Sequence, residues 1–156
     1  MDLNDLRQED FSVAVYEAAR VARVPRPQVT FESCGNVAAL VTDQGIRTIA
    51  CDWPWLLERL EVVPERDRFR ALLGVAAHEI AHFEKLGHQQ SPIENELFAD
   101  RFAGDVLRLM GVPTMPIKTL LAHLKKTPDH PEAADRIAAV GVGQAPSPLS
   151  RCVFRG

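Results

Sequence analysis

"HEIAHFEKLGH", residues 78–88, holds three histidines and two glutamates in eleven positions. His78 and His82 are four residues apart, so on a helix both imidazoles project from one face, about one turn apart. Glu79 lies on the adjacent edge of that helix, where it can reach a water molecule at the metal without itself being a ligand. The His-Glu-x-x-His spacing therefore predicts a catalytic site of the zinc-peptidase kind, with two metal ligands and a general base.

The alternative is that the two histidines share a helix face by chance, because the five-residue pattern alone also occurs in unrelated proteins. The preceding stretch "ALLGVAA" (71–77) is small and apolar, which predicts a buried helix at the point where the histidines emerge. A buried histidine pair without a metal would need other hydrogen-bond partners. We therefore expect one zinc ion per chain at this position.

A catalytic zinc usually has three protein ligands and one open position, and two residues compete for the third place. His88 fits the count of the pattern H-E-x-x-H-x-x-G-x-x-H, but Lys85 replaces the glycine at which that pattern turns sharply. Glu96 lies on the next predicted helix, which the short connection "GHQQS" (87–91) folds back against the first. We expect Glu96 to be the ligand. Asp100, one turn later, is expected to accept a hydrogen bond from a ligand histidine and fix its tautomer; the alternative for this pair is a solvated acidic face.

Three segments in this order carry a family resemblance: "AAHEIAHF" (76–83), "ENELFADRFAG" (94–104) and "DHPEAADRIAAV" (129–140). With them the chain resembles the gluzincin metallopeptidases of the M48 (Ste24/HtpX-like) type, with a glutamate-x-x-x-aspartate helix and a histidine-proline…arginine-isoleucine segment. Because no membrane span is present, it is most similar to their minimal soluble forms, the minigluzincins. The ImmA/IrrE-like regulatory proteases share the middle segment and rank second, since their usual context does not include the histidine-proline motif.

The resemblance implies a complete site, with the zinc ligands His78, His82 and Glu96, the base Glu79, and Asp100 beside a ligand histidine. It also implies that the strand before the active helix, about Ile46 to Cys51, is an edge strand that can hold a peptide by main-chain pairing.

Two further residues lie in the third segment. The resemblance places His130 over the site, where it would stabilise the oxyanion or approach the zinc, and places Arg136 where it would pair with Asp100. The alternative is that His130 merely starts the last helix and that Arg136 makes a surface salt bridge.

Apolar periodicity and turn residues predict an α+β fold, a mainly helical domain with a small antiparallel sheet inserted after the first helix. The family resemblance implies that this domain is zincin-like. Ser91 is a good N-cap and Gly111 can end the helix that Ser91 begins. Residues 1–143 are expected to form a single zincin-like metallopeptidase domain and residues 144–156 an irregular C-terminal tail. The expected helices span residues 4–24, 54–63, 65–86, 92–110, 116–126 and 131–140, and the strands lie within 28–52.

Composition excludes several classes of partner. The net charge is −3 with a pI near 5.9, so no positive field would attract nucleic acid or an anionic membrane. No apolar run reaches the roughly 18 residues of a membrane span, and the acidic amino terminus does not resemble a signal peptide. We therefore expect a cytoplasmic protein with free thiols. Among these, Cys152 in the tail is a remote candidate to bind the zinc as a thiolate and silence it.

The leading hypothesis is a zinc-dependent endopeptidase or oligopeptidase, active or latent, with a peptide or protein as its substrate. In it zinc polarises the peptide carbonyl, and Glu79 takes a proton from water and delivers it to the leaving amine. The competing hypothesis is a non-catalytic, zinc-braced module that binds a protein partner. Glu79 separates the two, because a structural site needs ligands but no base.

Overall fold

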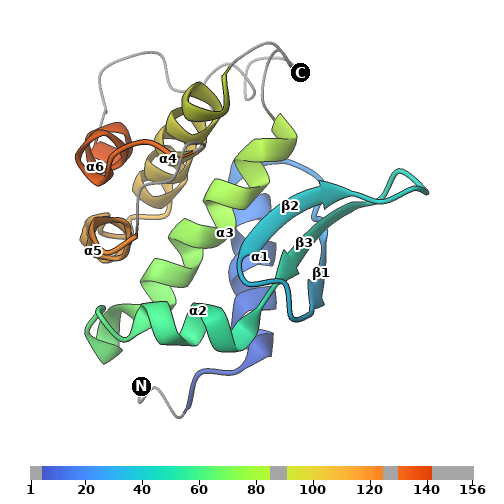
Figure 1. The fold of residues 1–156 in the computed structure, drawn as a ribbon, viewed down its shortest axis with the longest axis horizontal. Coiled ribbons are helices and arrows are strands. Elements are labelled where there is room, and N and C mark those ends of the chain that lie inside the picture. The colour runs from blue at the N-terminus through green and yellow to red at the C-terminus, as the bar shows by residue number, and fades with distance from the viewer. Residues whose placement is uncertain (1–4, 85–90, 125–129, 142–156) are drawn as a thin grey trace.

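A computed structural model of the chain describes residues 5–84, 91–124 and 130–141. The predicted α+β class, mainly helical with a small sheet after the first helix, is confirmed within these ranges (Figure 1). The predicted tail, and Cys152 with it, lies outside the described residues. The elements are α1 (Gln8–Ala22), β1 (Gln28–Phe31), β2 (Val37–Val41), β3 (Arg47–Cys51), α2 (Trp53–Leu60), the 3-10 turn η2 (Glu65–Asp67), α3 (Arg68–Glu84), α4 (Pro92–Leu109), α5 (Met115–Ala122) and α6 (Ala133–Gly141).

The sheet is mixed, so the prediction of an antiparallel sheet is wrong in one of its two pairings. β2 and β3 form an antiparallel hairpin whose turn is closed by a hydrogen bond from the Gly45 N–H to the Thr42 carbonyl (2.8 Å). β1, however, runs parallel to β3, and the strand order is β1-β3-β2. The chain therefore passes from β1 at one edge to β2 at the other edge and then returns to β3 between them. Residues on both faces of β3 are buried, as expected for a central strand.

This strand order also corrects the expected edge strand. The segment from Ile46 to Cys51 was predicted to be an edge that holds a peptide, but β3 is paired on both sides. The edge strand beside the helix that carries His78 and His82 is β2, which contacts α3 (Figure 1).

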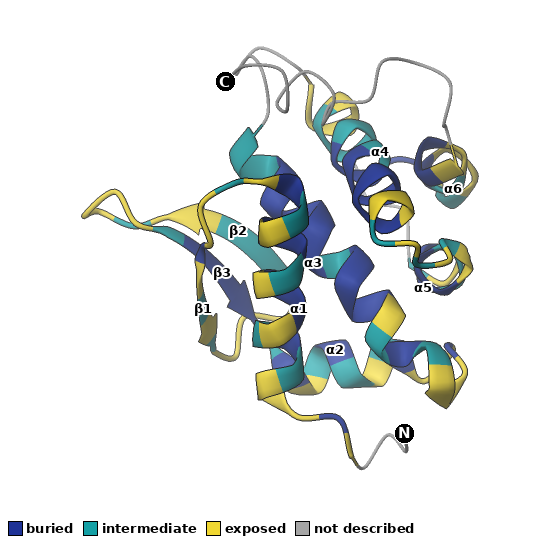
Figure 2. Ribbon diagram, turned by 180° about the vertical axis from the view of Figure 1, so that it is seen from behind, coloured by how far each residue is buried: buried dark blue, intermediate teal, exposed yellow. Residues whose placement is uncertain are grey.

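α3 runs through the middle of the molecule and is buried along most of its length (Figure 2). Helix α1 packs on one side of it and α4 on the other, while α5 packs against α3 and α6, and α6 packs against α4. Two glycines allow close helix contacts. A Cβ at Gly74 would lie 2.7 Å from the Ile117 Cβ, and one at Gly104 would collide with the Val140 carbonyl oxygen. α5 and α6 therefore rest directly on the helices that carry the predicted site.

Both ends of α4 are fixed as predicted. The Ser91 hydroxyl accepts a hydrogen bond from the Glu94 N–H (3.2 Å), and Gly111, with a φ of 69°, ends the helix. These caps set the length of α4 and so help to fix the residues that it turns toward α3. Across the described ranges, no helix combines the length and apolar character needed to cross a bilayer.

Candidate metal centre

Helix α3 presents the two histidines together. His78 is buried and His82 half-buried, with their ring centroids 4.9 Å apart and their Nε2 atoms 3.2 Å apart. The ligand atoms of His78, Glu79 and His82 all lie within 4.8 Å of one another, so this group can hold a metal ion.

Helix α4 brings the Glu96 carboxylate to the same point. Its two oxygens lie 3.2 Å from His78 Nε2 and 3.2 Å from His82 Nε2. Three ligands of a tetrahedral ion with bonds of about 2.05 Å would be about 3.3 Å apart. The three donor groups therefore already have the mutual spacing that one zinc ion requires, and two imidazoles with a carboxylate form a donor set typical of zinc.

His88, the competing third ligand, lies outside the described residues, as does Lys85, on which the argument against it depends. The choice of Glu96 over His88 stays a prediction. The structure does bring Glu96 to the histidines, which makes a further protein ligand unnecessary for a site with one open position.

Asp100 lies behind His78 in the interior. Its Oδ1 is 2.9 Å from His78 Nδ1, and because a carboxylate only accepts, the imidazole donates its Nδ1 proton. This hydrogen bond leaves Nε2 free to face a metal ion. Burial lowers the pKa of His78, but the hydrogen bonds to Asp100 and Glu96 outweigh burial and raise the pKa to about 10. The same negative groups that hold a proton on His78 would favour a metal cation.

Arg136 of α6 completes this cluster. Its Nε and Nη2 donate to the two oxygens of Asp100 (2.8 and 3.0 Å), and Nη2 also lies 3.4 Å from a Glu96 oxygen. Arg136 is only 6% exposed, which rules out the surface salt bridge of the alternative interpretation. The guanidinium thus orients two carboxylates: that of Asp100, which contacts His78 Nδ1, and that of Glu96, which faces the two Nε2 atoms.

Glu79 occupies the other edge of α3, toward β2, and its carboxylate accepts a backbone hydrogen bond from Ala39. The side chain is 7% exposed. Burial raises the pKa of Glu79, and the nearby His78 and His82 oppose that rise only in part. A carboxylate with a raised pKa is better suited to take and return a proton.

The charges of the site leave room for a dication. With neutral imidazoles, the carboxylates of Glu79, Glu96 and Asp100 outnumber the Arg136 guanidinium by two negative charges. One divalent cation would balance them. Without a metal ion, the proton that the raised pKa keeps on His78 supplies part of this balance, and a bound cation would take its place.

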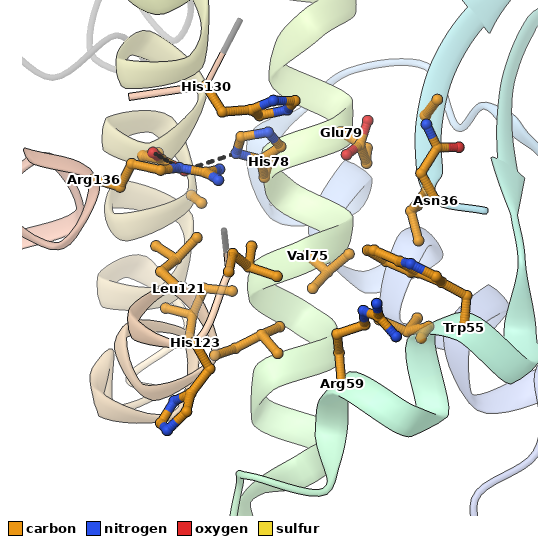
Figure 3. A pocket seen from close by; sticks show the side chains of 18 of the residues that line it. Asn36, Trp55, Arg59, Val75, His78, Glu79, Leu121, His123, His130 and Arg136 are labelled. Atoms are coloured by element: carbon orange, nitrogen blue, oxygen red, sulfur yellow. Dashed lines mark hydrogen bonds and ion pairs between the residues drawn. The ribbon is translucent and has the colours of Figure 1, made fainter. Parts of the chain in front are cut away.

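His130 lies beside His78 at the cavity next to the site (Figure 3). The structure therefore brings both His130 and Arg136 to the histidine pair. Arg136 is 36 residues from Asp100 along the chain, and His130 is even further from His78. His130 enters the site from the segment before α6, on the side of α3 that faces α4.

The cavity has a volume of about 790 Å³, and several residues outside the predicted site also line it. They include Asn36 next to β2, Trp55 of α2, Val75 of α3 and Leu121 of α5. Of these, only Val75 could have been placed near the site from the sequence, because it lies four residues before Glu79 and so on the same helix face. The others come from separate elements that only the tertiary fold brings together.

No family model, no curated protein and no solved structure matches this chain. The interpretation of the site therefore depends on the three sequence motifs and on the geometry of the residues that they contain.

Proposed function

We propose that this protein is a zinc-dependent metallopeptidase of the gluzincin type, a minimal form of the M48-like fold that hydrolyses peptide bonds. One observation carries the proposal. The donor atoms of His78, His82 and Glu96 stand 3.2 Å from one another, and the buried carboxylate of Glu79 lies beside them at the wall of an open cavity.

When bound, zinc supplies Lewis acidity that polarises a peptide carbonyl and makes water more acidic. Glu79 then acts as the catalytic base: its carboxylate takes a proton from the attacking water and returns it to the leaving amine. Asp100 and Arg136 are positioning residues, because they hold His78 in one tautomer and one orientation without reaching the substrate.

The edge strand β2 supports a binding mode for the peptide. Within the described residues β2 pairs with β3 on one side only, and its first residues, Val37 to Ala39, line the cavity. An extended peptide added to this edge would pass in front of Glu79, since Ala39 already hydrogen-bonds that carboxylate. In this proposal β2 pairs with the peptide backbone, which is the role that the resemblance gave to β3.

His130 is the candidate for oxyanion stabilisation. Its ring lies beside that of His78, and both residues line the cavity (Figure 3). A donor in that position would stabilise the negative charge that develops on the carbonyl oxygen in the transition state.

The test compares the wild type with Glu79→Gln, and uses Glu17→Gln as the matched control, since Glu17 pairs with Arg20 on the surface of α1. Metal content is measured by mass spectrometry, and cleavage is measured on an unfolded protein substrate. We expect about one zinc per chain in all three proteins and cleavage lost only in Glu79→Gln.

Zinc in all three proteins with the same negligible cleavage would contradict the enzyme and favour a zinc-braced module that binds a protein partner. Absence of zinc from the wild type after zinc loading would contradict both.

A further inference from the structure

The connection between β1 and β2, residues 32–36, crosses the end of β3 and is held there by hydrogen bonds. The Glu32 N–H donates to the Cys51 carbonyl (3.1 Å), and the Asp52 N–H donates to the Asn36 carbonyl (2.9 Å). Gly35 lies in this connection with a φ of 73°, a left-handed conformation that favours glycine. The path by which the chain enters β2 is therefore fixed against the end of β3.

The Asp52 carboxylate joins this connection to helix α2. One oxygen, Oδ2, accepts from the Gly35 N–H (2.8 Å), and the other, Oδ1, accepts from the Trp55 N–H in the first turn of α2 (3.2 Å). These hydrogen bonds, from Gly35 and from Trp55, hold the pKa of Asp52 below its usual range. At neutral pH the group is therefore ionised, and both oxygens can accept.

A helix cap alone does not require a carboxylate at this position, because serine and asparagine are equally good N-caps. Each of those side chains, however, has a single oxygen atom, whereas the carboxylate of Asp52 has two, one for each element. The second oxygen is the one that ties Gly35 to α2.

Both elements that Asp52 joins line the cavity of the proposed site, although Asp52 itself does not. The connection contributes Gly35 and Asn36, and α2 contributes Trp55. Figure 3 shows Asn36 and Trp55 on the same side of α3, opposite the side on which α5 lies. Asp52 therefore holds together one wall of the cavity, and Val37, the first residue of β2, continues that wall.

We propose that Asp52 is a positioning residue for substrate binding: its carboxylate holds the start of β2 and Trp55 in one arrangement, so that this wall is already formed when a peptide binds. The inference depends on the proposed peptidase function, in which an extended peptide pairs with β2. Without the hydrogen bond to Gly35, the start of β2 must be ordered at the moment of binding, and that cost lowers the affinity for the peptide. One such hydrogen bond is worth about 2- to 10-fold in an equilibrium constant.

The first arm of the test uses Asp52→Ser, which keeps a cap for α2 and loses the tie to Gly35. The KM and kcat of the zinc-loaded proteins are measured on a peptide that the wild type cleaves. We expect KM to rise about 2- to 10-fold and kcat and zinc content to stay unchanged, because Glu79 and the two histidines belong to α3.

Asp10→Ser is the matched control for this arm. The Asp10 carboxylate also accepts a backbone N–H at the start of a helix, that of Arg7 (2.7 Å), but it does not line the cavity. Its KM should equal that of the wild type. If Asp52→Ser fails to fold, Asp52→Asn takes its place, since asparagine also caps α2 and presents only one acceptor oxygen.

The second arm measures binding and local structure without turnover. The same peptide is titrated into zinc-loaded Glu79→Gln with and without Asp52→Ser, and the double variant should bind it about 2- to 10-fold more weakly. Amide hydrogen exchange, followed by NMR, should be faster at Gly35 in Asp52→Ser and unchanged at Trp55.

The two arms separate the two proposals. Glu79-dependent cleavage with an unchanged KM in Asp52→Ser, or equal peptide binding with and without that substitution, would overturn the positioning role and leave the peptidase intact. A fall in kcat or zinc content in Asp52→Ser would overturn it too, because the residue would then support the whole site and not the binding wall. Absence of Glu79-dependent cleavage together with weaker peptide binding in the double variant would overturn the peptidase and leave Asp52 as the positioning residue of a peptide-binding site.

Discussion

Replacement of Asp100 by asparagine should weaken zinc binding although Asp100 touches no metal. Asp100 is 1% exposed, and its two oxygens accept from His78 Nδ1 at 2.9 Å and from Arg136 at 2.8 and 3.0 Å. An asparagine keeps one acceptor oxygen and turns an amide NH₂ toward donors. At least one of the three hydrogen bonds is therefore lost, and the negative charge that faces His78 disappears.

The magnitude follows from these contacts. A second-sphere partner of a metal-binding histidine is worth about 10- to 100-fold in metal affinity, or about 1.4 to 2.7 kcal/mol. In addition, leaving a buried donor of Arg136 without its acceptor costs about 1–3 kcal/mol of folding stability. Asp100→Asn should therefore lose both affinity and stability.

Asp105→Asn is a matched control on the same helix. Asp105 is also buried and pairs with an arginine, Arg108, at 2.6 Å, but it does not contact the histidines. Zinc dissociation constants are measured by competition with a chelating dye, and unfolding by circular dichroism. Both variants should unfold at lower temperature, and only Asp100→Asn should show weaker zinc binding. If both kept the wild-type zinc affinity, the argument that Asp100 acts on the metal through His78 would be refuted.

Three further predictions concern other parts of the molecule. Glu96→Ala should lose zinc while His88→Ala keeps it, as measured by metal analysis after dialysis; the reverse result would transfer the ligand role to His88. Burial raises the pKa of the Cys51 thiol to about 12, so at pH 8 only about one molecule in 10⁴ carries the thiolate. Iodoacetamide should therefore label exposed Cys34 in the folded protein and Cys51 only after unfolding. Labelling of Cys51 in the folded protein, seen by peptide mass spectrometry, would contradict its burial. Ser91→Ala removes the N-cap of α4 and should lower stability by about 1 kcal/mol in a denaturant titration, with an unchanged midpoint counting against the cap.

Helices and their ends could be predicted from the sequence because their signals are local. The Ser91 cap, the Gly111 terminus and the His78–His82 spacing each depend on residues within a few positions of one another. The place of Glu96 also followed from short-range information, because a brief connection forces the next helix to pack against α3.

The sheet order could not be predicted in this way. Local alternation identifies strands, but it does not say which edge a strand occupies, and the parallel pairing of Gln28 with Thr48 spans 20 residues. The hairpin turn at Thr42–Gly45 was predictable and the position of β1 was not. As a result, the strand expected at the edge proved to be central, and the edge beside the site is β2.

The contacts of Arg136 could be predicted only in part. Nothing in the periodicity around residue 136 indicates its partner, and only the resemblance of the "HPEAADRI" segment to a family motif pointed to Asp100. Long-range charge pairing of this kind depends on how α6 packs on α4, which here requires the bare backbone surface of Gly104 under Val140.

That close contact between α4 and α6 has a consequence for the order in which the protein is made. The proposed ligands and the proposed base all lie between residues 78 and 96, so a ribosome delivers them well before it delivers Arg136. Until α6 docks, Asp100 and Glu96 face the histidines without their guanidinium, and the nascent site carries one more negative charge than the finished one. We therefore expect the docking of α6 to fix the orientation in which these two carboxylates face the histidines.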